Sequence, residues 1–153
     1  MTERSARGME SIATITFRKG LPSDLPALVG LDDYAQSHPK RAAFISAAVA
    51  QGECLVAEAE ARVLSFVVLN YRFFGFGFVS LIVVAASHRR RGLGLRLLAE
   101  AELRCTSHKL FTSTNLSNSA AQALFARAGF VRSGVVENLD QADAEIIFFK
   151  EIH

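Results

Sequence analysis

Hydrophobic and polar positions along this chain follow two periods, and each period predicts one kind of element. Runs that alternate or are rich in β-branched and aromatic residues predict strands, and Leu/Ala-rich stretches with helical spacing predict helices. In chain order the pattern is strand, two helices, three strands, helix, strand, helix and two strands. The predicted strands are 13–17, 54–59, 63–71, 73–84, 109–114, 131–136 and 145–150, and the predicted helices are 23–34, 39–50, 92–105 and 119–127. Periodicity alone supports a mixed α/β domain.

Capping and turn residues refine these boundaries. Ser23 is expected to cap the first helix, with Pro26 in its first turn. Ser119 and Gln122 have the spacing of a capping box. Gly75 and Gly77 interrupt the strand at 73–84, so a bulge or a tight approach is expected there.

Length and composition indicate one folded domain, which we place at residues 13–153 after a loose tail at 1–12. Hydrophobic residues make up 50% of the chain and charged residues 21%, which excludes a disordered protein. The net charge of +2 gives no reason to expect nucleic acid or a membrane as partner. Without a signal peptide or an apolar run of membrane-spanning length, we expect a cytoplasmic protein. Cys54 and Cys105 lack metal-ligand spacing and are interpreted as buried reduced thiols, although a single disulfide stays open.

The most informative segment is Arg89-Arg90-Arg91-Gly92-Leu93-Gly94, between the apolar run 79–84 and a helical pattern. The first turn of a helix has N–H groups without intrahelical partners, and the helix dipole adds positive charge there. Arginines strengthen the attraction for phosphate, and glycines let a ligand approach the backbone. The sequence therefore predicts a pyrophosphate-binding turn. A solvated charged turn is the alternative, and glycines at a helix start after a buried strand make it the weaker one.

Two common nucleotide motifs do not fit this segment. A Walker A loop requires a lysine after its glycines, and none is present. A dinucleotide fingerprint requires a third glycine at the position of Leu97.

The arrangement Arg-x-x-Gly-x-Gly after a strand instead resembles the acyl-CoA loop of the GNAT superfamily of N-acetyltransferases. Residues 82–88 resemble the family's fourth strand and the link after it. Residues 118–125, followed by 128–130, resemble its second motif, Asn-x-x-Ala-x-x-Leu-Tyr and then Gly-Phe. Together the motifs cover roughly a third of the chain. The resemblance implies a GNAT fold, with a central mixed, mostly antiparallel sheet of six to seven strands, splayed between strands four and five, and about four helices.

The same resemblance implies acetyl-CoA as cofactor. Backbone N–H groups of 90–95 would surround the pyrophosphate, and the backbone of strand four would face the pantetheine arm. An N–H near Val84 would polarise the thioester carbonyl, as an oxyanion-hole donor does. For Asn118, an ordinary helix-start role is an equal alternative. The implied cofactor-binding residues are Ile82, Val83, Val84, Arg89, Arg90, Arg91, Gly92, Leu93, Gly94, Leu95, Asn118 and Phe125.

Acetyl transfer to an amine poses two proton problems. Freeing a lysine-like amine of its proton at pH 7 costs roughly 4–5 kcal/mol, and the leaving thiolate benefits from a proton. Many family members supply Tyr and Glu for these tasks, but Phe125 and Ser113 stand at the matching positions. The catalytic candidates are therefore Val84 and Ser113. Three alternatives stay open. Holding the two reactants close together can be enough for transfer without a protein acid, or Ser113, Asn115 or a bound water can replace the missing acid and base. In the third alternative, the protein binds acyl-CoA without efficient transfer.

The acceptor side is framed in the family by the segments that match 32–38 and 137–143 here. Tyr34 and Asp140 are the candidate substrate contacts, and the carboxylates of both segments would suit a cationic amine; solvated loops are the alternative. His38 is assigned to the surface, and His88 to a structural role. The aromatic run 73–78 fits core packing or a homodimer interface better than an apolar acceptor pocket.

Two functions follow as hypotheses. The first is an N-acetyltransferase that moves acetyl from acetyl-CoA directly to a primary amine of a small molecule or peptide, without an acyl-enzyme. The second is an acyl-CoA-binding regulatory or vestigial module with little turnover. The absence of the two usual acid–base residues favours the second hypothesis, and an intact cofactor loop is compatible with both hypotheses.

Overall fold

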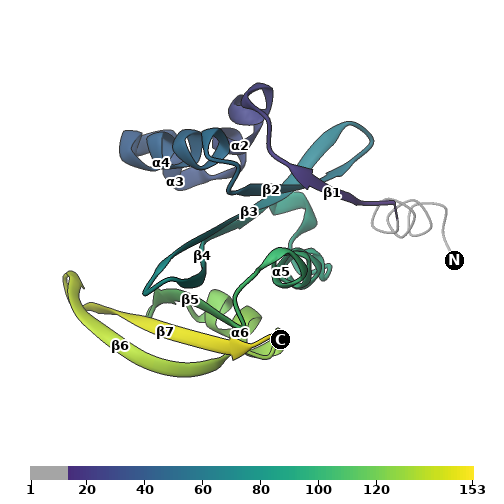
Figure 1. The fold of residues 1–153 in the computed structure, drawn as a ribbon. Helices are drawn as coiled ribbons and strands as arrows, with labels where there is room; N and C mark the ends of the chain where they lie inside the picture. Colours follow the sequence, from purple (N-terminus) through teal and green to yellow (C-terminus); the bar gives the residue numbers. More distant parts are fainter. Residues whose placement is uncertain (1–13) are drawn as a thin grey trace, which may run out of the picture. The chain divides into compact units, whose positions relative to one another are not determined.

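The computed structural model describes residues 14–153, so the predicted tail at 1–12 lies outside the described residues. The strands follow the predicted order, and so do the helices, except that the first predicted helix is divided into two (Figure 1). The strands are β1 (Thr16–Lys19), β2 (Cys54–Ala59), β3 (Arg62–Phe73), β4 (Phe76–Val84), β5 (Lys109–Asn115), β6 (Val131–Asp140) and β7 (Asp143–Glu151). The helices are η1 (Pro22–Asp24), α2 (Leu25–Leu31), α3 (Asp33–Ser37), α4 (Pro39–Ala50), η2 (Ala86–His88), α5 (Leu93–Arg104) and α6 (Ser119–Arg127).

The strands form one mixed sheet in the order β1-β2-β3-β4-β5-β7-β6. The pairs β1–β2, β2–β3, β5–β7 and β6–β7 are antiparallel, and β4 and β5 run parallel. The parallel pairing covers only Gly77 to Val79 on β4 and Leu110 to Thr112 on β5. So short a pairing agrees with the predicted splay between strands four and five, and the predicted GNAT fold class is confirmed.

Within 14–153, the residues fall into two compact units, and each is described by itself. One unit contains residues up to Val68 and Ile82–Leu97, and the other contains Leu69–Leu81 and Leu98–His153.

In the first unit, helices α2, α3 and α4 pack on one another and α4 lies against β2. Arg18 of β1 ties this unit together, because its guanidinium donates to both carboxylate oxygens of Asp24 (2.8 and 3.0 Å) and to Glu58 (2.9 Å from Nε). The hydrogen bonds from Arg18 to Asp24 lower the pKa of the Asp24 carboxyl. The fully buried core includes Leu28, Ile45, Val56, Phe66, Val67 and Leu97.

In the second unit, β5 and β7 have one covered face and one half-buried face. Thr112 pairs with Phe148, and the Phe148 ring packs against Phe125 of α6 at 5.6 Å between centroids. The opposite face bears Phe111 beside Phe149, and further along β5 the residues Ser113 and Asn115. Because side chains alternate along a strand, α6 covers only the first of these faces.

The prediction of one continuous helix at 23–34 is wrong. Asp32 has an extended backbone (φ −98°, ψ 98°) that separates α2 from α3, and its carboxylate accepts the Tyr34 N–H at 3.2 Å as an N-cap. Ser23 is not a cap either, because it lies inside η1 and the N-cap position of α2 is Asp24. The Asp24 carboxylate accepts the N–H of Leu21 at 2.6 Å. A side chain that caps from inside a periodic segment ends one helix and begins another.

The predicted strand 73–84 is also corrected. Phe73 ends β3, and Phe74 and Gly75 form a two-residue turn with φ of 54° and 82°. Two consecutive positive φ values match the twist of a tight hairpin, so Gly75 serves a turn and not a bulge. The tight approach expected at Gly77 is confirmed, because a Cβ there would lie 2.4 Å from the Cys105 sulfur.

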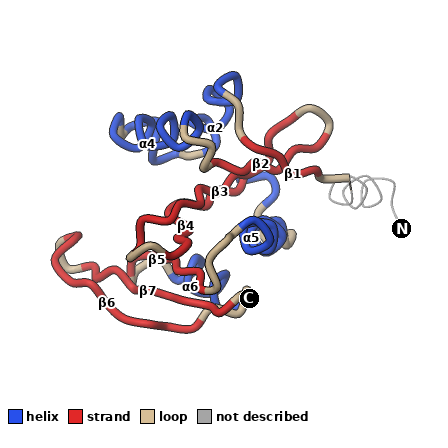
Figure 2. Tube along the Cα trace, viewed as in Figure 1, coloured by secondary structure: helices blue, strands red, loops and turns tan. Residues whose placement is uncertain are grey.

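The last hairpin is longer than predicted. Residues 137–140, expected in a loop, belong to β6, and the chain turns at Gln141 and Ala142, where φ is 60° at Ala142 (Figure 2). The capping box at Ser119 and Gln122 is also wrong, since the Asn118 side chain accepts the N–H of Ala121 at 3.1 Å. Helix α6 ends just before Gly129, whose φ of 92° lies in the left-handed region that favours glycine.

We expect Gly77→Ala to destabilise the protein by about 1–3 kcal/mol, because the new methyl group would overlap the buried Cys105 sulfur. Gly134→Ala is the matched control: it also lies in a strand, and nothing lies within 4 Å of its added Cβ. Urea unfolding measures both. Equal stability of the two variants would contradict the close contact.

Candidate active site

The turn between β4 and α5 has an unusual backbone. After η2, Arg90 (φ 64°) and Gly92 (φ 79°) both take the left-handed conformation, and α5 begins at Leu93. Nothing lies within 4 Å of a Cβ placed on Gly92, so the glycine serves the backbone angle and leaves open space beside it. The side chains of 89–91 are exposed. The open first turn of α5 and the exposed guanidinium groups fit a diphosphate, as the sequence predicts.

Two leucines fix the start of α5 on the first unit. Leu93 and Leu97, one turn apart, are 1% and 0% exposed. The Arg96 guanidinium lies 5.6 Å from the ring centroid of Phe17 on β1. The helix end that carries the unpartnered N–H groups is therefore held on a rigid base.

Strand β4 begins with its backbone in a regular orientation. Gly77 N–H donates to Ser107 Oγ at 2.9 Å, and the Val79 carbonyl accepts from Thr112 Oγ1 at 2.8 Å. The backbone of both residues is therefore turned toward β5. In a regular strand the orientation alternates, so Val84, five residues later, would be turned toward β3.

Val84 does not follow that alternation. The Ala85 N–H donates to the Leu64 carbonyl of β3 at 2.8 Å, and the C=O and N–H of one planar peptide point in opposite directions. The Val84 carbonyl therefore points away from β3, where Arg89 Nε donates to it at 3.2 Å. At the end of β4, the Val84 carbonyl is therefore paired with the Arg89 side chain and not with β3.

His88 lies between the strand and the arginine turn, half-buried. Its Nδ1 is 2.8 Å from the hydroxyl of Ser87. Burial lowers the pKa of His88 below its usual range, and the positive charges of Arg91 and Arg62 lower it further. The pKa of His88 is therefore sensitive to the charges around the turn. The contribution of Arg62 could not be predicted from its position in the sequence, 26 residues earlier.

The second unit holds the remaining predicted residues. Ser113 Oγ donates to Glu145 Oε2 at 2.6 Å, and Asn115 Nδ2 donates to Asp140 Oδ2 at 2.8 Å. Glu145 was not singled out from the sequence, because only the pairing of β5 with β7 brings it to Ser113.

Asn118 and Phe125 both have structural tasks in this unit. Asn118 is the N-cap of α6, and Phe125 is 2% exposed and packs against Phe130 and Phe148. Their contacts with a cofactor stay predictions.

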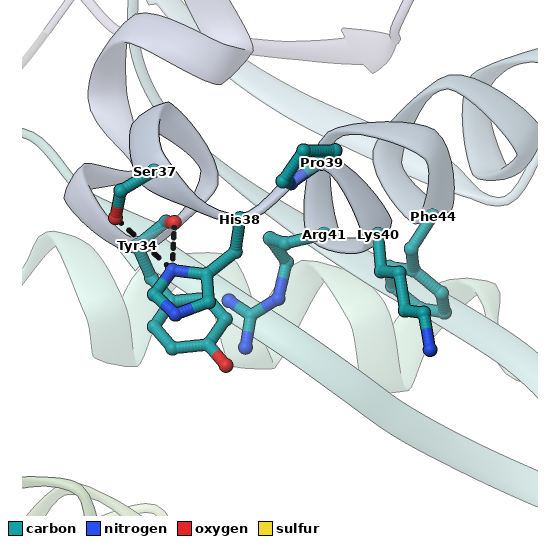
Figure 3. A pocket seen from close by; sticks show the side chains of 7 residues that line it. All are labelled: Tyr34, Ser37, His38, Pro39, Lys40, Arg41 and Phe44. Atoms are coloured by element: carbon teal, nitrogen blue, oxygen red, sulfur yellow. Dashed lines mark hydrogen bonds between the residues drawn. The ribbon is translucent and has the colours of Figure 1, made fainter.

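A pocket opens at the junction of α3 and α4 in the first unit (Figure 3). The rings of Tyr34 and His38 stack with centroids 3.6 Å apart, and the Arg41 guanidinium lies 4.6 Å from the Tyr34 centroid. Asp32 is 6% exposed and paired with Arg41 at 3.0 Å. Its carboxylate is therefore not an open ligand for a cationic amine. The lining residues are Tyr34, Ser37, His38, Pro39, Lys40, Arg41 and Phe44.

Comparison with known proteins identifies the family. The sequence profile of the Acetyltransferase (GNAT) family matches residues 18–130, well over half of the chain. The chain belongs to the GNAT family of acetyltransferases. It is therefore an acetyl-CoA-dependent enzyme, and the family expected from the two motifs is confirmed.

Solved structures agree with this assignment. A GNAT-family acetyltransferase from Bacillus cereus ATCC 10987 is 34% identical, with 90% of this chain and 97% of that chain covered and a TM-score of 0.83. The ribosomal-protein-S18-alanine N-acetyltransferase of Escherichia coli shares the fold at 23% identity, 91% and 94% coverage and a TM-score of 0.74. The yncA protein of Salmonella typhimurium, whose structure includes its cofactor acetyl-CoA, also shares the fold. It is 20% identical, with 91% of this chain and 94% of that chain covered and a TM-score of 0.70. No curated protein sequence gives a significant match.

Neither thiol of this acetyltransferase is placed for covalent chemistry. Cys54 and Cys105 are both free and buried, so the disulfide left open by the sequence is not formed. Burial raises the pKa of the Cys54 thiol to about 12, and the nearby negative charge of Asp24 raises it further. Among residues 14–153, no helix is both long and apolar enough to cross a bilayer.

We expect the pKa of His88 to rise when CoA is added to the acetyltransferase. A diphosphate at the turn would offset the positive charge of Arg91, which now disfavours the protonated imidazole. NMR titration of the His88 ring measures the shift, with His88→Gln identifying its signal. Pantetheine, which lacks the phosphates, is the control ligand. An unchanged titration curve with saturating CoA would contradict a diphosphate beside Arg91.

Proposed function

We propose that this acetyltransferase moves the acetyl group of acetyl-CoA directly to a primary amine of a small molecule or a peptide. The observation that carries the proposal is the turn at Arg90 and Gly92, which offers the first N–H groups of α5 next to exposed arginines. That chemistry suits the diphosphate of CoA. A cytoplasmic location is proposed with it, on the strength of two reduced thiols.

Within this proposal, the residues at 82–95 divide two tasks. The N–H groups of 90–95 hold the diphosphate, with Arg89, Arg90 and Arg91 adding charge. The backbone of Ile82, Val83 and Val84 lies along the arm of the cofactor. The Val84 carbonyl supports this assignment, because it points away from β3 at the end of β4. When bound, acetyl-CoA supplies an activated acetyl thioester, and an N–H aimed at its carbonyl would stabilise developing negative charge.

Direct attack by the amine is favoured over an acyl-enzyme. A covalent route needs a nucleophile with an accessible, ionised or base-activated atom. Cys54 and Cys105 are 2% and 3% exposed, and the raised pKa of Cys54 keeps its thiol protonated at neutral pH. The acceptor nitrogen is therefore proposed to attack the acetyl carbon itself.

The α3–α4 pocket is proposed to contact the acceptor. Tyr34 is 51% exposed and its ring is held by His38 on one side and Arg41 nearby, which makes a preorganised flat surface. Asp140, on β6 of the second unit, stays a proposed acceptor contact by itself; it is exposed and accepts from Asn115 Nδ2 at 2.8 Å. The net charge of +2 gives no support for nucleic acid or a membrane as partner.

Release of free CoA from acetyl-CoA in the presence of a panel of amines tests the function. The panel includes polyamines, amino acids, aminoglycosides and peptides with a free N-terminus. Amine-dependent release, with the acetylated amine detected by mass spectrometry, is the expected result. Tight binding of acetyl-CoA without transfer to any amine would instead favour an acyl-CoA-binding module.

Gly92→Glu should weaken acetyl-CoA binding by at least about tenfold, because a carboxylate in the turn repels the diphosphate. Gly75→Glu is a matched control, because Gly75 also has a positive φ (82°) and nothing within 4 Å of an added Cβ. This variant adds the same charge and a similar backbone strain in the β3–β4 turn, away from the turn between β4 and α5. Calorimetric titration measures both. Similar affinities of the two variants would rule out the turn as the diphosphate site.

Tyr34→Ala should raise KM for the acceptor by up to about tenfold and leave kcat nearly unchanged, as expected when a flat binding surface is lost. Tyr34→Phe keeps the ring and serves as the control. Steady-state kinetics with the best amine of the panel measures both variants. A wild-type KM in Tyr34→Ala would place the acceptor elsewhere.

A further inference from the structure

We propose that the α3–α4 pocket selects an acceptor amine that also carries a carboxylate, as an amino acid does. This inference rests on the proposed transfer of acetyl to a primary amine and names the class of that amine. The pocket has a volume of about 530 Å³, within the range of small-molecule sites. All of its lining residues belong to the first unit.

The lining of this pocket is positively charged. It includes Lys40 and Arg41, and no aspartate or glutamate is among the lining residues. Both cations lie in the first turn of α4, where the helix dipole is also positive and no acidic residue is present. The sequence alone suggests the opposite charge, because Asp32 and Asp33 precede this junction.

Asp32 does not offer its charge to a ligand. Its side chain is 8% exposed, and its two oxygens accept from the Tyr34 N–H at 3.2 Å and from Arg41 Nη1 at 3.0 Å. Its negative charge therefore offsets that of Arg41. Within 14–153, no carboxylate pairs with Lys40, which is exposed, so its ammonium group stays uncompensated in the pocket.

Arg41 is held in place and still has donors for a ligand. Its guanidinium lies 4.6 Å from the Tyr34 ring centroid, and Asp32 fixes its Nη1 atom. A guanidinium has five N–H groups, and within 14–153 one of them bonds to a side chain. Figure 3 shows the ends of Lys40 and Arg41 extending from α4 on the same side as the Tyr34 ring. One carboxylate could therefore be met by both cations.

The aromatic part of the pocket suits the body of an amino acid. The Tyr34 and His38 rings are parallel within 4°. His38 Nδ1 lies 2.8 Å from the Tyr34 carbonyl oxygen, which can only accept, so Nδ1 carries a proton and the bond fixes the ring. Phe44 adds a half-buried apolar side chain. An apolar amino-acid side chain can pack on these rings, whereas a polyamine brings only further positive charge.

Matched pairs of acceptors test the carboxylate. L-Phenylalanine, L-leucine and L-methionine are each compared with the corresponding amide, which has the same side chain and no negative charge. For the best of these pairs, kcat/KM of the wild-type protein should be about fivefold or more higher for the acid, and spermidine should be a poorer acceptor than either. A short acidic peptide offers the same chemistry, so alanyl-glutamate and alanyl-glutamine form a separate arm that identifies the source of the carboxylate.

Lys40→Gln should lower kcat/KM about fivefold for the acid and leave that for the amide unchanged, because only the acid loses an ionic partner. Lys40→Arg should restore the preference. Lys19→Gln is the matched control, since it removes the same charge from an exposed lysine of β1 in the same unit. Equal kcat/KM of acid and amide in the wild type, or an unchanged preference in Lys40→Gln, would overturn the inference.

A binding measurement separates this inference from the proposed function. NMR titration of the His38 ring with L-phenylalanine and with its amide reports the pocket without any chemistry, and His38→Gln identifies the signal. If the wild-type protein acetylates no amine, the proposed function fails and this titration decides the charge preference. Tighter binding of the acid than of the amide would uphold the preference, and equal binding would overturn it.

Discussion

The site depends on one constraint: the backbone must leave β4, reverse through a short turn and start α5 with its first N–H groups uncovered. Arg90 and Gly92 meet this constraint with positive φ values, and Leu93 and Leu97 hold the helix that follows. A left-handed conformation costs a residue with a Cβ roughly 1–2 kcal/mol, so Arg90 is a strained position. Glycine at position 90 would relax the backbone but would not carry a guanidinium group.

The order of elements could be predicted from the sequence because each element has a local cause. Helix α4 begins at Pro39 and stops before Gly52, and α6 stops before Gly129, as their residue types indicate. The break between α2 and α3 could not be predicted in this way. It depends on Asp32, which also pairs with Arg41, and that pairing exists only after the helices have packed.

The turn at 89–94 was more accessible to sequence reasoning than the contact between Ser113 and Glu145. The turn at 89–94 is contiguous, so its arginines and glycines can be recognised in one motif. The orientation of the Val84 carbonyl cannot be recognised in the sequence, because it is visible only in the partners of Val84 and Ala85. Ser113 and Glu145 are 32 positions apart and meet through strand register, which hydrophobic alternation alone does not fix.

The burial of both cysteines has a practical consequence for the chemistry of this enzyme. A reagent that detects newly formed CoA by its sulfur also reacts with any accessible protein sulfhydryl. With Cys54 and Cys105 enclosed in the two cores, the enzyme contributes little background colour, and a cysteine engineered onto the surface would be labelled selectively. The native protein is thereby suited to optical assays and to site-directed fluorescent tagging without prior removal of its own sulfur.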